Sequence, residues 1–173
     1  NNIMDFKKLA NQYRDELLDN VLPFWLEHSQ DLEFGGYFSC LDREGKVFDT
    51  DKFIWLQGRE VWMFSMLYNK VEKRQEWLDC AVQGGEFLKK YGHDGNYNWY
   101  FSLDRSGRPL VEPYNIFSYT FATMAFGQLS LATGNQEYAD IAKKTFEIIL
   151  SKVSNPKGKW NKLHPGTRNL KNF

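Results

Sequence analysis

Apolar residues recur every three or four positions in five stretches of the chain, which predicts helices there. These stretches are residues 4–28, 53–70, 74–91, 114–133 and 135–153. Pro23 predicts a kink or a break in the first helix, because proline has no amide hydrogen for the helical ladder. The second and fourth helices are apolar on nearly every side, as enclosed helices are. The third and fifth carry a single apolar stripe, so we expect them to face water on the other side.

The chain repeats itself at a nearly constant period. Tyr-Phe-Ser-Cys-Leu-Asp-Arg-Glu-Gly at 37–45 returns one residue shorter at 100–107, an offset of 63 from Tyr37 to Tyr100. The offset between the outer helices is 61, from Glu76 to Glu137. Residues 34–45 alternate apolar and polar positions around glycines, which predicts a short hairpin or an extended loop. The repeating unit is therefore a loop, an inner helix and an outer helix.

This order predicts an all-α fold, an α/α toroid of helical hairpins whose inner helices line a pocket. An open superhelix is the structural alternative. A further turn region begins at 155–158, and the last residues resemble the approach to another helix. The units present cannot close a ring, so we expect residues 1–173 to be the N-terminal half of one toroid domain.

Composition narrows the possible partners and compartment. Basic and acidic residues balance at 22 each, so no charge excess points to nucleic acid or an anionic membrane. The polar N-terminus does not read as a signal peptide, and no apolar run approaches the ~20 residues that span a bilayer. Two isolated cysteines, Cys40 and Cys80, suit a reducing compartment, and we expect the cytoplasm. Aromatic residues make up 17% of the chain, which fits dense helix packing or a sugar site.

The segment at 53–62 is the strongest candidate for chemistry. Trp55 and Arg59 are four residues apart and share one helix face. A guanidinium on an enclosed helix is costly to bury unless it meets an anion or a polar ligand. The alternative is a structural ion pair of Arg59 with Glu60 or Glu112.

The remaining polar candidates favour structural roles. His28 ends the first helix and His93 lies in a helix stop signal, so both are interpreted as structural, whereas His164 could face the mouth of a ring. Asp42 and Asp104 recur with the repeat and are expected to bond backbone amides in turns. The sequence has no metal-ligand spacing, phosphate-binding loop or nucleophile elbow.

The stretch Trp-Leu-Gln-Gly-Arg-Glu-Val-Trp-Met at 55–63 resembles the N-acylglucosamine 2-epimerase family, which includes renin-binding proteins and cellobiose 2-epimerases. Residues 34–38, 116–125 and 166–168 agree with it, and the resemblance covers essentially the whole chain. It implies a toroid of six helical hairpins, an (α/α)6 barrel, about twice as long as this chain.

The resemblance also implies a reaction, the inversion of C2 of a reducing sugar through an enediolate, without metal or cofactor. Carried over residue by residue, Arg59 would stabilise the enediolate, and Trp55 would line the pocket or brace Arg59. Ser118 matches a position expected to be polar near the substrate, Arg168 lies in a stretch that agrees with the family, and His164 is a substrate-binding candidate from its loop position alone. The family's acid/base histidine pair lies in the second half of the toroid, so we expect this chain alone to be inactive.

Other functions remain open at this point. They are an aldose–ketose isomerase of the same fold, a helical-toroid glycoside hydrolase or lyase, and a non-catalytic protein-binding module. A hydrolase would need two pocket carboxylates about 5 to 9.5 Å apart. The expected partner is a small sugar, with no nucleic acid polymer and no membrane. The specific sugar, a homodimer and a nucleotide effector, which some relatives bind, are left undecided.

Overall fold

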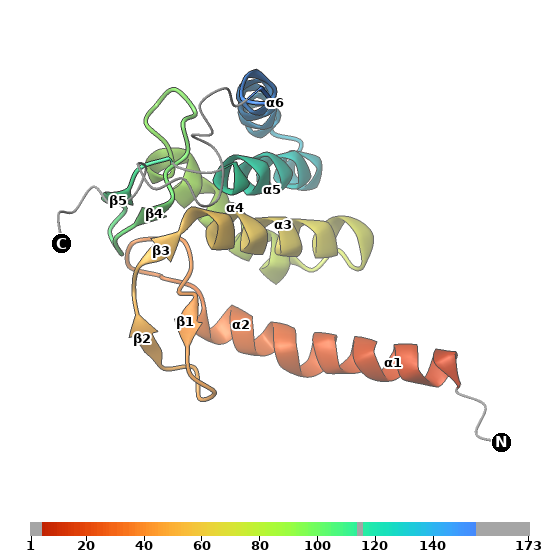
Figure 1. Ribbon diagram of the computed structural model, residues 1–173. Coiled ribbons are helices and arrows are strands. Elements are labelled where there is room, and N and C mark those ends of the chain that lie inside the picture. The colour runs from red at the N-terminus through yellow and green to blue at the C-terminus, as the bar shows by residue number, and fades with distance from the viewer. Residues whose placement is uncertain (1–4, 114–115, 155–173) are drawn as a thin grey trace.

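The computed structural model describes residues 5–113 and 116–154 of the chain. An N-terminal helical segment precedes two helical hairpins (Figure 1). Its parts are α1 (Phe6–Glu16), the π-helical turn η1 (Leu17–Val21) and α2 (Leu22–His28), and the hairpins are α3 (Ile54–Lys70) with α4 (Gln75–Tyr91) and α5 (Phe117–Thr133) with α6 (Gln136–Ser151). The inner helices α3 and α5 pack on each other, α4 packs on α3, and α6 on α5. Layers of helices thus form the body of the molecule, as the periodicity predicts.

The first helix changes its hydrogen-bond register just before Pro23, where a kink or a break was predicted, but it does not end there. In η1 the amide of Leu22 donates to the carbonyl of Leu17, five residues back, and Pro23 follows in the first turn of α2. Proline cannot donate to the turn before it, so the ladder shifts its register at this position. The helix continues without a break into α2, and Leu22 at its start is buried in the core (Figure 1).

Short strands connect the loops that precede the inner helices. β1 (Cys40–Leu41) pairs antiparallel with β2 (Val47–Asp49), which confirms the predicted hairpin. A second sheet has the order β3-β4-β5, formed by β3 (Lys52–Phe53), β4 (Ser102–Leu103) and β5 (Pro109–Val111). Because β3 belongs to the first repeat and β4 and β5 to the second, this sheet ties the two repeats together directly before α3 (Figure 1).

The repeated turns are alike at the level of single hydrogen bonds. Asp42 and Asp104 each accept, through Oδ1, the backbone N–H four residues on. Gly45 and Gly107 follow three residues after each aspartate with φ of 84° and 102°, a conformation that glycine adopts without strain. The turn-forming role expected for both aspartates is confirmed.

Each loop is anchored to an outer helix by one buried aromatic side chain. Tyr37 donates its hydroxyl to the carbonyl of Cys80 on α4 at 2.7 Å. Trp99 donates Nε1–H to Thr145 Oγ1 on α6 at 3.0 Å. Both rings are fully buried, and Tyr37 lies so close to Gly84 that a Cβ there would collide with its hydroxyl.

The two described histidines hold local structure, as expected. His93 accepts the amides of Gly95 and Tyr97 at Nδ1, so its Nε2–H donates to the carbonyl of Lys89. Burial lowers the pKa of His93, which keeps the ring neutral in this role. The His28 ring lies against Phe24 at the end of α2.

A buried ion cluster joins three segments of the chain. Lys52 Nζ lies 2.8 Å from Asp31 Oδ2, with both side chains fully buried, and it also donates to the carbonyls of Gly35 and Arg105. Arg105 forks onto the same carboxylate, with Nε at 3.0 Å and Nη2 at 3.1 Å. Burial alone would raise the pKa of Asp31, but the hydrogen bonds from Arg105 and Lys52 outweigh it and hold that pKa at about 2.

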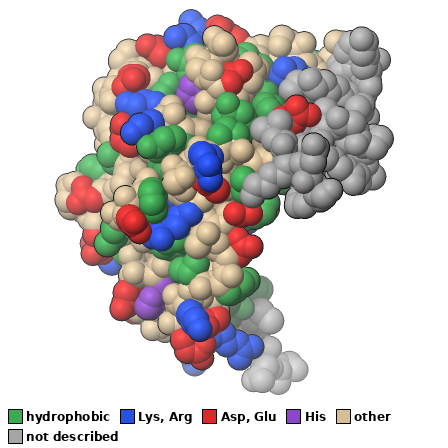
Figure 2. Space-filling view, turned by 90° about the vertical axis from the view of Figure 1, so that its left-hand side faces the viewer, with side chains coloured by type: hydrophobic (Ala, Val, Ile, Leu, Met, Phe, Trp, Pro, Cys, Tyr) green, Lys and Arg blue, Asp and Glu red, His purple; other side chains and the backbone are tan. Residues whose placement is uncertain are grey.

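The described surface of the face formed by the strands and loops has no large patch of a single charge sign (Figure 2). Lys and Arg side chains are interspersed with Asp and Glu over its described part (Figure 2). This mixture agrees with the balanced charge of the sequence. Within the described part of the chain, no helix combines the length and apolarity that crossing a membrane demands.

Replacing Asp31 should destabilise the fold strongly. Asp31→Ala leaves the buried Lys52 ammonium without its counter-ion, which costs about 3 to 5 kcal/mol in the free energy of unfolding measured in urea. Glu33→Ala is the control, because Glu33 also pairs with Arg105, at 2.9 Å, but its side chain is 64% exposed. That variant should lose less than about 1 kcal/mol, and an equal loss in both would contradict the role given to the buried cluster.

Gly84→Ala should also destabilise the fold, by about 1 to 3 kcal/mol, because the new methyl group displaces the Tyr37 ring from α4. Gly127→Ala on α5 is the matched control, since a Cβ there meets nothing within 4 Å. It should stabilise the helix by roughly 0.5 to 1 kcal/mol. Both values come from thermal or urea unfolding, and a stabilised Gly84→Ala variant would refute the packing argument.

Candidate functional site

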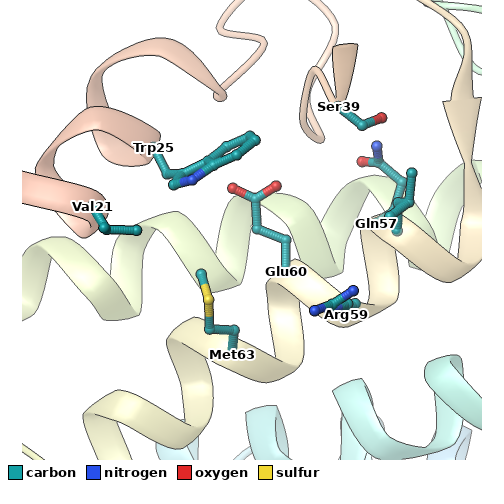
Figure 3. Close-up of a pocket in the computed structure, with 8 residues that line it drawn as sticks. Val21, Trp25, Ser39, Gln57, Arg59, Glu60 and Met63 are labelled. Carbon is teal, nitrogen blue, oxygen red and sulfur yellow. The ribbon is translucent and has the colours of Figure 1, made fainter. Parts of the chain in front are cut away.

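A cavity of about 300 Å³ lies between the N-terminal helical segment and α3 (Figure 3). Its apolar wall consists of Val21, Trp25, Leu56 and Met63. Its polar groups are Ser39, Gln57, Arg59 and Glu60. Sites for small ligands span about 300 to 1,000 Å³ and combine an apolar lining with a few polar groups, so this cavity suits a small polar molecule.

Arg59 is the free cation of the cavity. It lies in the second turn of α3, and its side chain is exposed. It forms no hydrogen bond or ion pair with any residue of 5–113 and 116–154, so the pairing with Glu60 or Glu112 that the sequence left open is not formed there. A guanidinium that bonds none of these residues can bind an anionic or polar ligand.

Glu60 points away from Arg59, toward the indole of Trp25 (Figure 3). Its Oε1 lies 2.6 Å from Ser29 Oγ, and Ser29 is fully buried at the end of α2. Burial raises the pKa of Glu60 to about 8. The carboxyl is therefore largely neutral at pH 7.

The Gln57 side chain holds the loop that closes the cavity. Its Oε1 accepts the N–H of Tyr37 at 2.8 Å, and its Nε2 donates to the carbonyl of Tyr37 at 2.7 Å. This pair of bonds mimics a strand ladder and fixes the loop to α3. Ser39, two residues on, lines the cavity, and its buried Oγ has no hydrogen-bond partner in the described part of the chain.

The site residues predicted from the sequence do not all line this cavity. Arg59 lines the cavity, whereas Trp55 does not and lies with its ring 6.0 Å from that of Phe121 on α5. Ser118 is buried at the start of α5, also outside the cavity wall. His164 and Arg168 lie outside the described residues. The substrate-binding roles of these residues stay predictions.

Sequence reasoning missed most of the cavity wall. Gln57 and Glu60 belong to the same motif as Arg59, but Gln57 was given no role and Glu60 was considered only as a partner for Arg59. Trp25 carries no spacing signal, since it lies 34 residues before Arg59 (25 to 59) in a helix of ordinary amphipathic pattern. The contact between Glu60 and the buried Ser29 hydroxyl could not be predicted from the sequence, because the two residues are 31 positions apart.

The cavity narrows the possible chemistry. Among the described residues, no three His, Cys, Asp or Glu side chains gather as a metal-binding set. Glu60 is the one carboxylate among the described residues of the cavity wall, so this wall lacks the pair that a glycoside hydrolase uses. What it presents is one free guanidinium beside neutral polar groups.

Comparisons with known proteins give a consistent relationship. The N-acylglucosamine 2-epimerase (GlcNAc 2-epimerase) family matches residues 36–172. The N-acylglucosamine 2-epimerase of Mus musculus is 44% identical over 140 residues, which cover 79% of this chain and 33% of the mouse protein. The enzyme of Bos taurus is 43% identical over 154 residues, 86% of this chain and 36% of the bovine protein. The chain thus spans about a third of the length of the curated relatives it matches.

Solved structures agree with the sequence relatives. The cellobiose 2-epimerase of Bacillus thermoamylovorans B4167 superimposes with a TM-score of 0.77 at 29% identity, over 88% of this chain and 39% of that chain. This likeness confirms the predicted fold, part of an α/α toroid with α3 and α5 as inner helices. By its sequence and its fold, the chain belongs to the N-acylglucosamine 2-epimerase family.

Proposed function

We propose that the protein to which this chain belongs is a sugar 2-epimerase that inverts C2 of a reducing sugar. An N-acylglucosamine is the proposed substrate, because relatives of that name are 43–44% identical to this chain, whereas cellobiose 2-epimerases are 28–31% identical. Inversion at C2 converts it to the corresponding N-acylmannosamine.

The reaction begins with the open-chain aldehyde. A base removes the C2 proton, the C2–H electron pair forms a C1–C2 double bond, and the carbonyl oxygen at C1 becomes an oxyanion. Return of a proton to the opposite face of C2 restores the aldehyde with inverted configuration. A carbon acid of this kind is very weak, so the reaction depends on stabilising the oxyanion as its charge develops.

One observation carries the proposal, namely that Arg59 lines the cavity and has no counter-ion among residues 5–113 and 116–154. Its N–H groups can donate hydrogen bonds to the C1 oxygen, and these bonds become stronger as that oxygen becomes anionic. An interaction that is stronger in the transition state than in the ground state lowers the barrier. Trp25 and Met63 form an apolar wall of the same cavity.

Further contacts to the sugar are proposed from the family resemblance and, for His164, from its loop position in the sequence. Trp55 on α3 and Ser118 on α5 would extend the site along the inner helices, and His164 and Arg168 would contribute from the segment after α6. The groups that move the proton are not assigned to residues of this chain, since the resemblance puts them in the second half of the toroid.

Arg59→Ala in the complete protein should lower kcat/KM about 100- to 1,000-fold, as loss of one oxyanion-stabilising donor does elsewhere. The melting temperature should change little, because Arg59 bonds no described residue. Activity is measured with N-acetylglucosamine in heavy water, where epimerisation places deuterium at C2 of both epimers. Arg74→Ala is the control, because Arg74 is a surface residue paired with Glu72 at 2.8 Å.

The same assay separates the other functions. Normal activity in Arg59→Ala would return Arg59 to a structural role. Formation of a ketose would indicate an aldose–ketose isomerase, and cleavage of cellobiose would indicate a hydrolase. Absence of deuterium uptake from N-acetylglucosamine, mannose and cellobiose in the wild type would refute the epimerase proposal.

A further inference from the structure

Two short contacts converge on one buried hydroxyl beside the cavity. Ser29 Oγ lies 2.6 Å from the carbonyl oxygen of Trp25 and 2.6 Å from Glu60 Oε1. Two oxygen atoms at this distance are ordinarily joined by an O–H···O hydrogen bond. The arrangement therefore contains two O–H···O hydrogen bonds and needs two protons.

Counting protons assigns the second one to Glu60. The Ser29 hydroxyl has one proton, and the Trp25 carbonyl can only accept. If Ser29 donates to Trp25, the contact with Oε1 is a hydrogen bond only when Glu60 is a carboxylic acid that donates to Ser29 Oγ. An ionised Glu60 would have to draw the Ser29 proton to itself and leave two oxygens at 2.6 Å without a proton between them.

The other carboxyl oxygen is free for a ligand. Oε2 of Glu60 forms no hydrogen bond with a described residue, and the side chain lines the cavity. In Figure 3 the carboxyl group projects into the space between Trp25 and Ser39. With the proton on Oε1, Oε2 is a carbonyl-type oxygen that accepts a hydrogen bond and carries no charge.

We propose that Glu60 binds the ligand of this cavity as a neutral carboxylic acid. It donates its proton to Ser29 and offers Oε2 to a hydroxyl or amide N–H of the sugar. The identity of the ligand rests on the proposed function, whereas the protonation of Glu60 does not.

The neutral form also preserves the charge of Arg59. A carboxylate in the same cavity would offset the positive charge that the developing enolate oxyanion needs, because charges interact strongly in a partly buried site. A carboxylic acid supplies hydrogen bonds without that offset. Glu60 is thus a ligand-binding residue that leaves Arg59 as the free cation.

The pH at which Glu60 ionises should limit ligand binding. Its pKa of about 8 exceeds the ordinary value of 4.5, so the neutral form prevails at pH 7 and is lost as the pH rises through about 8. The titratable and charged groups on the surrounding elements include Asp19 of η1, Glu27 and His28 of α2, Arg59 of α3, and Tyr37 and Cys80, the two whose pKa values respond to the charge of Glu60. Burial raises the pKa values of Tyr37 and Cys80, so these two stay neutral across the same range.

The first test reads the protonation state without any ligand. The infrared spectrum of the complete protein at pH 7 should contain a carboxylic acid C=O band that Glu60→Gln lacks and Glu27→Gln retains. The band should vanish between pH 7 and pH 9. A difference spectrum that shows only a carboxylate at pH 7 would overturn the proposal.

The second test measures binding of the alditol of N-acetylglucosamine, an open-chain analogue that cannot react, by calorimetry. The wild-type Kd should rise about tenfold per pH unit above pH 8, since only the neutral fraction binds. Glu60→Gln, whose amide can donate to Ser29 and keep an oxygen in the cavity, should change less than about twofold between pH 7 and pH 9. Glu60→Leu should bind about tenfold more weakly than the wild type at pH 7.

Each outcome points to one conclusion. An unchanged wild-type Kd between pH 7 and pH 9, equal losses in Glu60→Gln and Glu60→Leu at pH 7, or no binding of the alditol would refute the ligand-binding role. Binding with the expected pH dependence in a protein that incorporates no deuterium at C2 would instead refute the epimerase proposal alone. Glu27→Gln, an exposed residue of α2, should follow the wild type throughout.

Discussion

The buried carboxylate of Asp31 is the interaction on which the arrangement of the loops depends. It binds Lys52 of β3 and Arg105 of the second repeat, and each of these cations would be costly to bury or immobilise alone. The cluster therefore fixes three segments at once, above the start of α3. Ser29 lies two residues before Asp31 and contacts Glu60, so the cluster that stabilises the loops also sets the geometry of one cavity wall.

Local signals predicted the helices well, because the periodicity of apolar residues is present within each segment. The helix predicted at 53–70 is observed as Ile54–Lys70, and that predicted at 74–91 as Gln75–Tyr91. The β3-β4-β5 sheet was missed because strands of two or three residues are too short to show alternation. Its pairing joins residues about fifty positions apart, so it exists only once the two repeats have packed together.

The candidate site could be predicted only in part, since a sequence gives the face of a helix but not what lies opposite. Trp55 and Arg59 are four residues apart, which separates them by about 40° around the helix axis. That angle is enough for Trp55 to meet Phe121 of α5 while Arg59 lines the cavity on the side of α2. Glu60 is bonded to Ser29, 31 residues earlier, and no spacing rule connects the two.

Arg59 and Glu60, the two ionisable residues of α3 that line the cavity, differ in their access to solvent. Arg59 is exposed and keeps its charge at little desolvation cost, whereas the Glu60 carboxyl is enclosed and is more stable with its proton. A glycoside hydrolase would instead need two carboxyl groups that face each other across the pocket, one ionised and one protonated. A cavity wall with one cation and no described anion favours chemistry in which negative charge develops on the substrate. Deprotonation beside a sugar carbonyl is chemistry of that kind.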